Sequence, residues 1–221
     1  GKRINQIDHE EGQKGKIIKL TIDTEIQKFT SELLKNKAGS ISVMDIYTGE
    51  IIAMNSSPSF DPNLFIYGID KNIWKEIKNN PSKPLINKTI SGLYSPGSTI
   101  KPLVALSALE NDVIKPNMKV KCEGKVEMYG QTYHCWREKG HGYMSLKNAI
   151  KQSCDIYFYE VARLLGVDKL NLTAEKFGLG KKVLGEYFPN EKQGVFPSTK
   201  WKKKAIGQNW YLGETFITGI G

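Results

Sequence analysis

The pattern of apolar and polar residues predicts strands in the N-terminal part of the chain. Residues 16–22 form a β-rich run, and residues 40–46 and 51–54 form two more. The turn signal Thr48-Gly49-Glu50 lies between the last two runs. We therefore predict a β-hairpin at this point.

Apolar residues at helical spacing, with polar residues at the segment ends, predict several helices. Aspartate and serine are good N-caps, and glycine ends helices readily. Five helices are predicted. The first begins after Asp23, the second spans about 98–110, and the third begins after Ser145. The fourth spans 156–165 and ends at Gly166, and the fifth begins at Asp168 and ends near Phe177-Gly178. The apolar positions share one face of each helix: Ile26, Phe29, Leu33 and Leu34 in the first of these helices and Leu146, Ala149 and Ile150 in the third.

The segments between these elements differ in character. Residues 1–15 are polar and read as an N-terminal arm or linker. Residues 56–84 and 178–197 read as loops, the former with a short helical patch near Trp74, whereas residues 119–143 are glycine-rich, aromatic and strand-like. We expect residues 16–221 to form one domain, or most of a larger one.

Composition adds limits to this picture. With 221 residues, 39% of them hydrophobic, the chain can build a core. No run approaches 18 apolar residues, so we expect neither a membrane span nor a signal peptide within it. The net charge of +9 comes from dispersed lysines without a nucleic-acid recognition motif, and we therefore expect a solvated basic surface and no nucleic-acid partner.

The strongest candidate for chemistry is the segment from Tyr94 to Pro102. A Ser-Pro-Gly turn leads into an apolar helix, and Ser98 and Lys101 are spaced to share one face of it. A serine hydroxyl needs a neighbouring base to become a nucleophile, and an uncharged lysine amine can be that base. A capping serine beside a solvated lysine is the plain alternative.

The surrounding residues resemble the active-site segment of penicillin-binding proteins. Ser98-x-x-Lys101 matches the first element that these proteins share with class A β-lactamases. Ser153-Cys154-Asp155 resembles the second, Ser-Asp-Asn, with Ser153 and Asp155 at a junction between two helices. The third element, Lys-Thr-Gly, is missing, because Lys88-Thr89 is followed by Ile90. The details are most similar to class B enzymes of the penicillin-binding protein 2 type.

This resemblance implies an α/β (α+β) fold of the penicillin-binding transpeptidase and serine β-lactamase type. In this fold helices flank an antiparallel sheet. The resemblance further implies that the domain is truncated at its C-terminus, before the Lys-Thr-Gly strand. The implied activity is a peptidoglycan D,D-transpeptidase that β-lactam antibiotics inhibit. In that reaction Ser98 attacks, Lys101 takes its proton, Ser153 relays a proton and Asp155 holds Lys101 or substrate. No cofactor takes part in catalysis.

The resemblance also implies partners and a location. The partners would be peptidoglycan stem peptides, β-lactams and a membrane glycosyltransferase of the cell-elongation machinery. The domain would be periplasmic, anchored in the bacterial inner membrane by a segment outside this sequence. A serine β-lactamase or a β-lactam-sensing receptor domain remains the alternative, since either uses the same first element.

The three cysteines and one histidine form a second candidate site. Cys122, Cys135, His141 and Cys154 together offer the four ligands of a tetrahedral zinc ion. His134 is the alternative imidazole, and Gly140 and Gly142 favour His141 because they let the backbone turn it inward. A disulfide with one thiol left over, or three unrelated buried thiols, would also fit. The resemblance points to a metal site with a ligand at position 154.

Overall fold

The computed structural model describes residues 12 and 14–221, and these residues form two compact units, one ending at Thr89 and the other spanning Ile90–Gly221. Each unit contains both helices and strands, as the predicted α/β (α+β) class requires. The arm predicted at residues 1–15 lies almost entirely outside the described residues. No helix in the described part of the chain is long and apolar enough to cross a bilayer.

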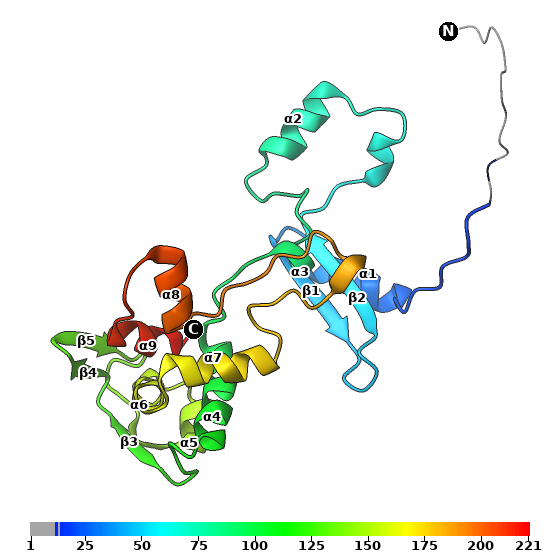
Figure 1. Ribbon diagram of the computed structural model, residues 1–221. Helices are drawn as coiled ribbons and strands as arrows, with labels where there is room; N and C mark the ends of the chain where they lie inside the picture. The colour runs from blue at the N-terminus through cyan, green and yellow to red at the C-terminus, as the bar shows by residue number, and fades with distance from the viewer. Residues whose placement is uncertain (1–11, 13) are drawn as a thin grey trace, which may run out of the picture. The chain divides into compact units, whose positions relative to one another are not determined.

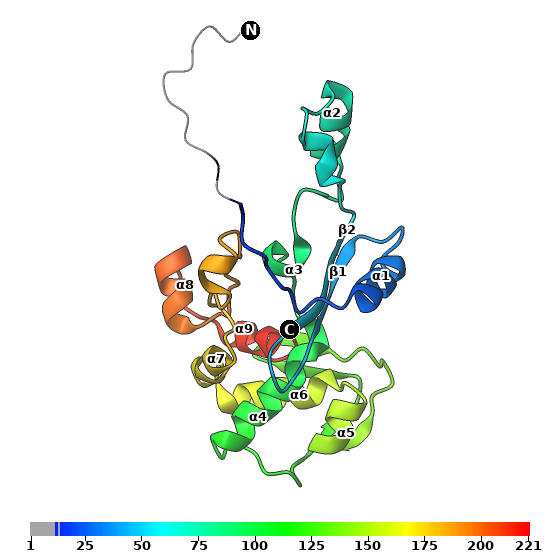
Figure 2. The same ribbon diagram turned by 90° about the vertical axis from the view of Figure 1, so that its right-hand side faces the viewer.

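The first unit is built on one hairpin and one helix. Strands β1 (Gly39–Met44) and β2 (Ile51–Ser57) pair antiparallel, and helix α1 (Thr24–Leu33) packs against β2 (Figure 2). The carboxylate of Asp23 accepts hydrogen bonds from two backbone N–H groups of the first turn, both at 2.9 Å. The predicted hairpin and the predicted N-cap are therefore confirmed.

The strand predicted at residues 16–22 is wrong. No strand partner pairs with this run among the described residues, and Ile17 is fully exposed. The run is held only near its end, where the Thr21 hydroxyl donates to the Ile51 carbonyl at 2.6 Å. A β-rich composition does not make a strand without a ladder to join. The unit continues through η1 (Pro62–Phe65), α2 (Lys71–Asn79) and α3 (Lys88–Ser91).

Packed helices form the core of the second unit. Helix α6 (Asp155–Leu165) packs against α4 (Lys101–Glu110), α7 (Val167–Lys176) and α9 (Leu212–Thr218) (Figure 1). The middle of α6 is apolar on nearly all sides, which suits its central position. The short helices α5 (Leu146–Lys151), α8 (Thr199–Ile206) and η3 (Gly185–Tyr187) complete the unit.

The helix boundaries refine the sequence prediction at the candidate site. The helix expected from residue 98 is a 3₁₀ turn, η2 (Gly97–Ile100), followed by α4 from Lys101. The side chain of Ile150, predicted on one face with Leu146 and Ala149, is 41% exposed. Leu146 and Ala149 are the buried residues of α5. Ile150 lies near the end of this helix, which is only six residues long and is followed by the turn at Ser153. Of the apolar face predicted for the first helix, Ile26, Phe29 and Leu33 are exposed too, and only Leu34 is buried.

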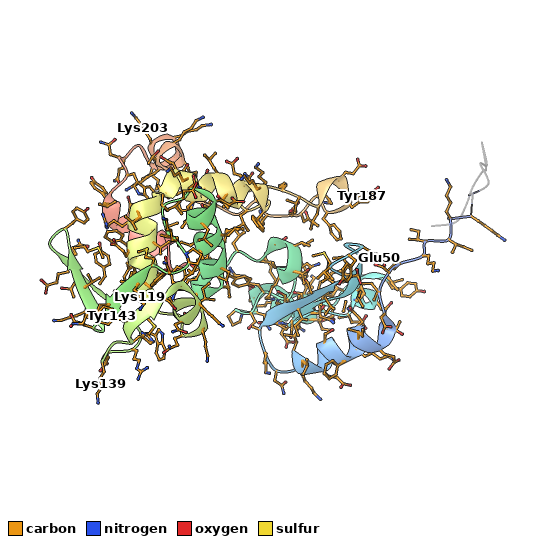
Figure 3. All side chains as sticks on the ribbon, turned by 90° about the horizontal axis from the view of Figure 1, so that it is seen from below. Glu50, Lys119, Lys139, Tyr143, Tyr187 and Lys203 are labelled. Atoms are coloured by element: carbon orange, nitrogen blue, oxygen red, sulfur yellow. The ribbon has the colours of Figure 1, made fainter. Side chains whose placement is uncertain are left out.

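Two nested hairpins lie between α4 and α5 in the sequence. Strand β3 (Lys119–Cys122) pairs with β6 (Gly142–Ser145), and β4 (Lys125–Met128) pairs with β5 (Gln131–His134), both antiparallel. Lys119 and Tyr143 lie on the outer pair (Figure 3). The labelled side chains of Lys139 and Lys203 point away from the unit, as expected for a solvated basic surface.

Candidate active site and metal cluster

Ser98 lies on the exposed 3₁₀ turn that leads into α4. Gly97 before it has φ +56°, and the backbone N–H of Lys101 donates to the Ser98 carbonyl, which closes the turn. Side chains three residues apart eclipse one another in a 3₁₀ turn. Ser98 and Lys101 are therefore neighbours along one edge, with the serine at the surface and the lysine inside.

The Lys101 side chain is buried and fully engaged by the second motif. It is 2% exposed, and Nζ lies 2.6 Å from Asp155 Oδ1. Nζ also donates to the hydroxyl and the carbonyl oxygen of Ser153, each at 3.0 Å. Within the described part of the chain none of these bonds goes to Ser98. The structure thus brings three of the four predicted catalytic residues into direct contact.

The junction between α5 and α6 presents Ser153 and Asp155 to the lysine. Ser153 has φ +52°, in the left-handed region that a non-glycine residue enters only at a cost of roughly 1–2 kcal/mol. This conformation turns both its hydroxyl and its carbonyl oxygen toward Lys101. Asp155 is the first residue of α6, and its carboxylate suits the positive end of the helix dipole.

Trp136 is a residue of this site that the sequence analysis missed. Its backbone N–H donates to Asp155 Oδ2 at 2.9 Å, so both carboxylate oxygens have a partner. Its indole N–H donates to the carbonyl oxygens of Gln152 and Ser153, both at 3.1 Å. The only signal in the sequence was its position next to Cys135.

The four predicted metal ligands converge in one buried cluster. The ligand atoms of Cys122, Cys135, His141 and Cys154 all lie within 4.8 Å of one another, and no disulfide joins the cysteines. His141 Nδ1 lies 3.5 Å from the sulfur atoms of Cys122 and Cys135. Tetrahedral zinc, with bonds of about 2.3 Å to sulfur and about 2.0–2.1 Å to nitrogen, separates such ligand atoms by about 3.5 Å.

The local backbone explains why His141 rather than His134 joins the cluster. Gly140 has φ +72°, and a Cβ on it would lie 2.2 Å from the Cys122 carbonyl oxygen. The His141 backbone N–H donates to that same oxygen at 3.0 Å. Only glycine allows this approach, which directs the His141 ring inward. His134 is exposed at the end of β5.

The environment of the cluster favours neutral groups. Burial raises the pKa of the Cys135 and Cys154 thiols, and burial lowers the pKa of the His141 ring. His141 Nε2 is buried and has no hydrogen-bond partner among the described residues. A divalent cation would supply the charge that turns the thiols into thiolate ligands. The donor set, its spacing and its burial therefore fit zinc.

A cavity of about 950 Å³ lies beside the Ser98 turn. Apolar residues of α4 and of the 177–196 segment form most of its wall, and the turn contributes Ser95, Pro96 and Thr99. Neither Ser98 nor Lys101 lines it.

Known proteins are similar to this chain in sequence and in fold. Peptidoglycan D,D-transpeptidase MrdA of Escherichia coli (strain K12) is 36% identical over 223 residues, covering 100% of this chain and 35% of that protein. The crystal structure of Pseudomonas aeruginosa PBP2 in complex with WCK 5153 superposes with a TM-score of 0.86 at 40% identity, covering 91% of this chain and 46% of that one.

A third similar protein is PBP2 of Helicobacter pylori in its complex with MreC, with a TM-score of 0.85 and 35% identity. The match covers 90% of this chain and 37% of that one. The chain spans about a third of the length of the curated relatives it matches. The sequence profile of the penicillin binding protein transpeptidase domain matches residues 39–221. The chain, with the predicted fold, thus belongs to the penicillin-binding protein transpeptidase family.

Proposed function

We propose that this chain is the part of a peptidoglycan D,D-transpeptidase that carries the nucleophile and its proton-transfer groups. The observation that carries the proposal is the buried contact of Lys101 with Ser153 and Asp155, one turn from the exposed Ser98. The 36% identity to a curated D,D-transpeptidase over the whole chain supports the same reaction.

In the proposed reaction Ser98 Oγ attacks the carbonyl carbon of the penultimate D-Ala of a stem peptide. Lys101, in its uncharged form, accepts the hydroxyl proton. The new Oγ–C bond forms an acyl-enzyme as the C–N bond breaks, and Ser153 relays a proton to the leaving D-Ala amine. An acceptor amine then attacks the acyl carbon, the C–Oγ bond breaks, and a proton from the amine passes to Ser98 Oγ, which restores the hydroxyl. β-Lactams acylate the same oxygen, and no cofactor enters any step.

The Ser98 backbone N–H is one proposed donor of the oxyanion hole. A donor of this kind contributes about 10²–10³ in rate, because it is aimed at charge that develops in the transition state. Asp155 does not touch substrate in this scheme. It fixes the lysine through Oδ1 while Trp136 holds Oδ2.

A structural zinc ion on Cys122, Cys135, His141 and Cys154 is the second part of the proposal. Cys154 lies between Ser153 and Asp155, and Cys135 precedes Trp136, whose N–H reaches Asp155. A metal ion there would fix both sides of the catalytic carboxylate. It would contribute geometry and folding energy and no chemistry.

The location and partners extend the proposal to the whole protein. We place the domain in the periplasm, attached to the inner membrane by a segment outside this sequence, acting on stem peptides beside a glycosyltransferase. The complex of Helicobacter pylori PBP2 with MreC supports an assembly with other cell-wall proteins.

Fluorescent penicillin labelling of the full-length protein tests the proposed nucleophile. We expect a stable label on the wild type and none on Ser98→Ala. Ser95→Ala is the matched control, because Ser95 is exposed on the same segment and three residues upstream, and it should label normally. Persistent label on Ser98→Ala rejects Ser98, and rapid turnover of nitrocefin would indicate a β-lactamase instead.

A further inference from the structure

The peptide that carries the Ser98 N–H is in contact with a glycine far along the chain. Gly221 has φ +98°, and a Cβ built on it would lie 2.1 Å from the carbonyl oxygen of Gly97 and 2.5 Å from its carbonyl carbon and nitrogen. Real Cβ atoms essentially never approach this closely. The two backbones therefore touch, and only glycine at position 221 permits it.

The contact acts on one particular peptide unit. The Gly97 carbonyl and the Ser98 N–H belong to the same planar group, so a tilt of one tilts the other by the same angle. Ser98 N–H is the proposed oxyanion donor, and such a donor works only when aimed at the position of the oxyanion. The orientation of this donor thus depends on what lies against Gly97.

The other end of this contact is well anchored. Helix α9 carries Phe216, which is fully buried and packs edge-on against Tyr133 at 5.0 Å between ring centres. The Gly221 N–H donates to the Ile217 carbonyl at 3.1 Å. A Cβ on Gly219 would lie 2.5 Å from Ala162 Cβ and 3.2 Å from the Phe158 carbonyl oxygen, so α9 ends directly on α6.

We propose that Gly221 is a positioning residue for catalysis: the segment from Gly219 to Gly221 links α6 to the Gly97 peptide and fixes the direction of the Ser98 N–H. This inference rests on the proposed function, since it assigns that N–H to the oxyanion hole. Gly221 touches neither substrate nor the reacting atoms. It sets the distance between the first motif and the helix that begins with Asp155.

The test compares Gly221→Ala with Gly207→Ala in the full-length protein. Gly207 also has positive φ, at +76°, but its Cβ position is open, so both variants carry backbone strain and only one presses on Gly97. Stopped-flow acylation by a β-lactam gives the dissociation constant and the acylation rate constant separately. We expect Gly221→Ala to lower the acylation rate constant at least about tenfold with an unchanged dissociation constant.

The control outcomes separate this inference from the proposed function. Gly207→Ala should acylate within about twofold of the wild-type rate, and its melting temperature should be comparable to that of Gly221→Ala. Equal acylation rates for the two glycine variants, with Ser98→Ala unlabelled, would overturn the inference and leave the function standing. Label on Ser98→Ala would overturn the function itself.

A second pair of variants covers the case in which Gly221→Ala does not fold. Gly219→Ala pushes the end of α9 away from the Ala162 methyl group. It should lower the acylation rate constant, and adding Ala162→Gly should restore it by removing that methyl group. Wild-type acylation by Gly219→Ala, or no rescue by the double variant, would contradict the proposed link.

Discussion

Trp136 and Asp155 are joined by a hydrogen bond from the tryptophan backbone N–H to Oδ2 of the carboxylate, 2.9 Å long. Because Oδ1 of the same carboxylate accepts from Lys101 at 2.6 Å, the aspartate bridges the hairpin region to the proposed catalytic lysine. One carboxylate thus connects the candidate metal ligands, through Cys135 and Trp136, to the proposed site of proton transfer.

We predict that Asp155→Asn lowers the β-lactam acylation rate about 10²-fold. An amide has a single acceptor oxygen, so its NH₂ group would face either Lys101 Nζ, which donates to Oδ1 in the structure, or the Trp136 N–H, donor against donor. Loss of a hydrogen bond to a charged group costs about 1.5–3 kcal/mol, which corresponds to roughly one to two powers of ten in rate. Labelling time courses with fluorescent penicillin measure the change.

Asp168→Asn is the control for this prediction. Asp168 also accepts two hydrogen bonds, from the backbone N–H and hydroxyl of Thr199 at 2.9 and 2.7 Å, but none of its bonds involves the catalytic residues. Its acylation rate should equal that of the wild type. An Asp155→Asn protein that acylates as fast as Asp168→Asn would contradict the bridging role.

We predict about one zinc ion per chain by elemental analysis. Cys135→Ser and His141→Ala should lose the metal, whereas His134→Ala should keep it, because the His134 side chain is exposed and outside the cluster. Metal loss should also slow acylation, since Cys154 then no longer holds the segment between Ser153 and Asp155. Metal in His141→Ala but not in His134→Ala would mean that the wrong imidazole was chosen.

The sequence predicted those parts of the structure that depend on local signals. The Asp23 cap, the hairpin around Gly49 and the Gly166 helix end are each set by a few adjacent residues, and each was found. The strand predicted at residues 16–22 was wrong, because a strand needs a partner strand that local composition does not reveal. The position of Ile150 was also wrongly predicted. Helix α5 has only six residues, too few for the helical period to define which face is buried.

The residues of the candidate site likewise fall into those that local sequence signals predict and those that they do not. Ser98 and Lys101 lie within one motif, and the four cluster residues are of types that commonly bind metal, so both groups could be predicted from residue identity and spacing. Trp136 and Gly221 act through their backbones, and a backbone contact leaves little trace in residue type. Glycine at position 221 was the one visible sign, and it gains meaning only when Gly97 is seen against it.

We predict that Ser153→Ala and Ser153→Gly have equal effects on activity and different effects on stability. Both remove the hydroxyl that lies 3.0 Å from Lys101 Nζ, so both should lower acylation about 10²-fold or more. Only glycine relieves the strain at φ +52°. Ser153→Gly should therefore be about 0.5–1 kcal/mol more stable than Ser153→Ala in denaturant unfolding.

This pair separates the chemical role of Ser153 from its backbone role. If Ser153→Gly acylated much faster than Ser153→Ala, the backbone conformation rather than the hydroxyl would be limiting. Equal unfolding midpoints for the two variants would show that the left-handed conformation stores no strain.

We predict that the ion pair between Lys202 and Glu214 stabilises the second unit in a pH-dependent way. Lys202 Nζ lies 2.6 Å from Glu214 Oε1, and the lysine side chain is 5% exposed. Burial by itself would raise the pKa of Glu214, but hydrogen bonds from Lys202 and the Tyr211 N–H, with the lysine charge, hold the pKa below its ordinary value of 4.5. Glu214→Gln should cost about 2 kcal/mol near neutral pH, because it leaves Lys202 without its anion.

The sign of the pH dependence follows from the lowered pKa of Glu214. The carboxylate is more acidic in the folded state, so its contribution is fully present above about pH 4.5 and is lost as the pH falls through the folded pKa. Melting temperatures of the wild type and Glu214→Gln should therefore differ near neutral pH and converge in acid. Glu110→Gln is the control: its pair with Lys176 is exposed and 3.4 Å long, so it should shift the melting temperature little at any pH. A wild-type minus Glu214→Gln difference that stays constant in acid would rule out the carboxylate as its source.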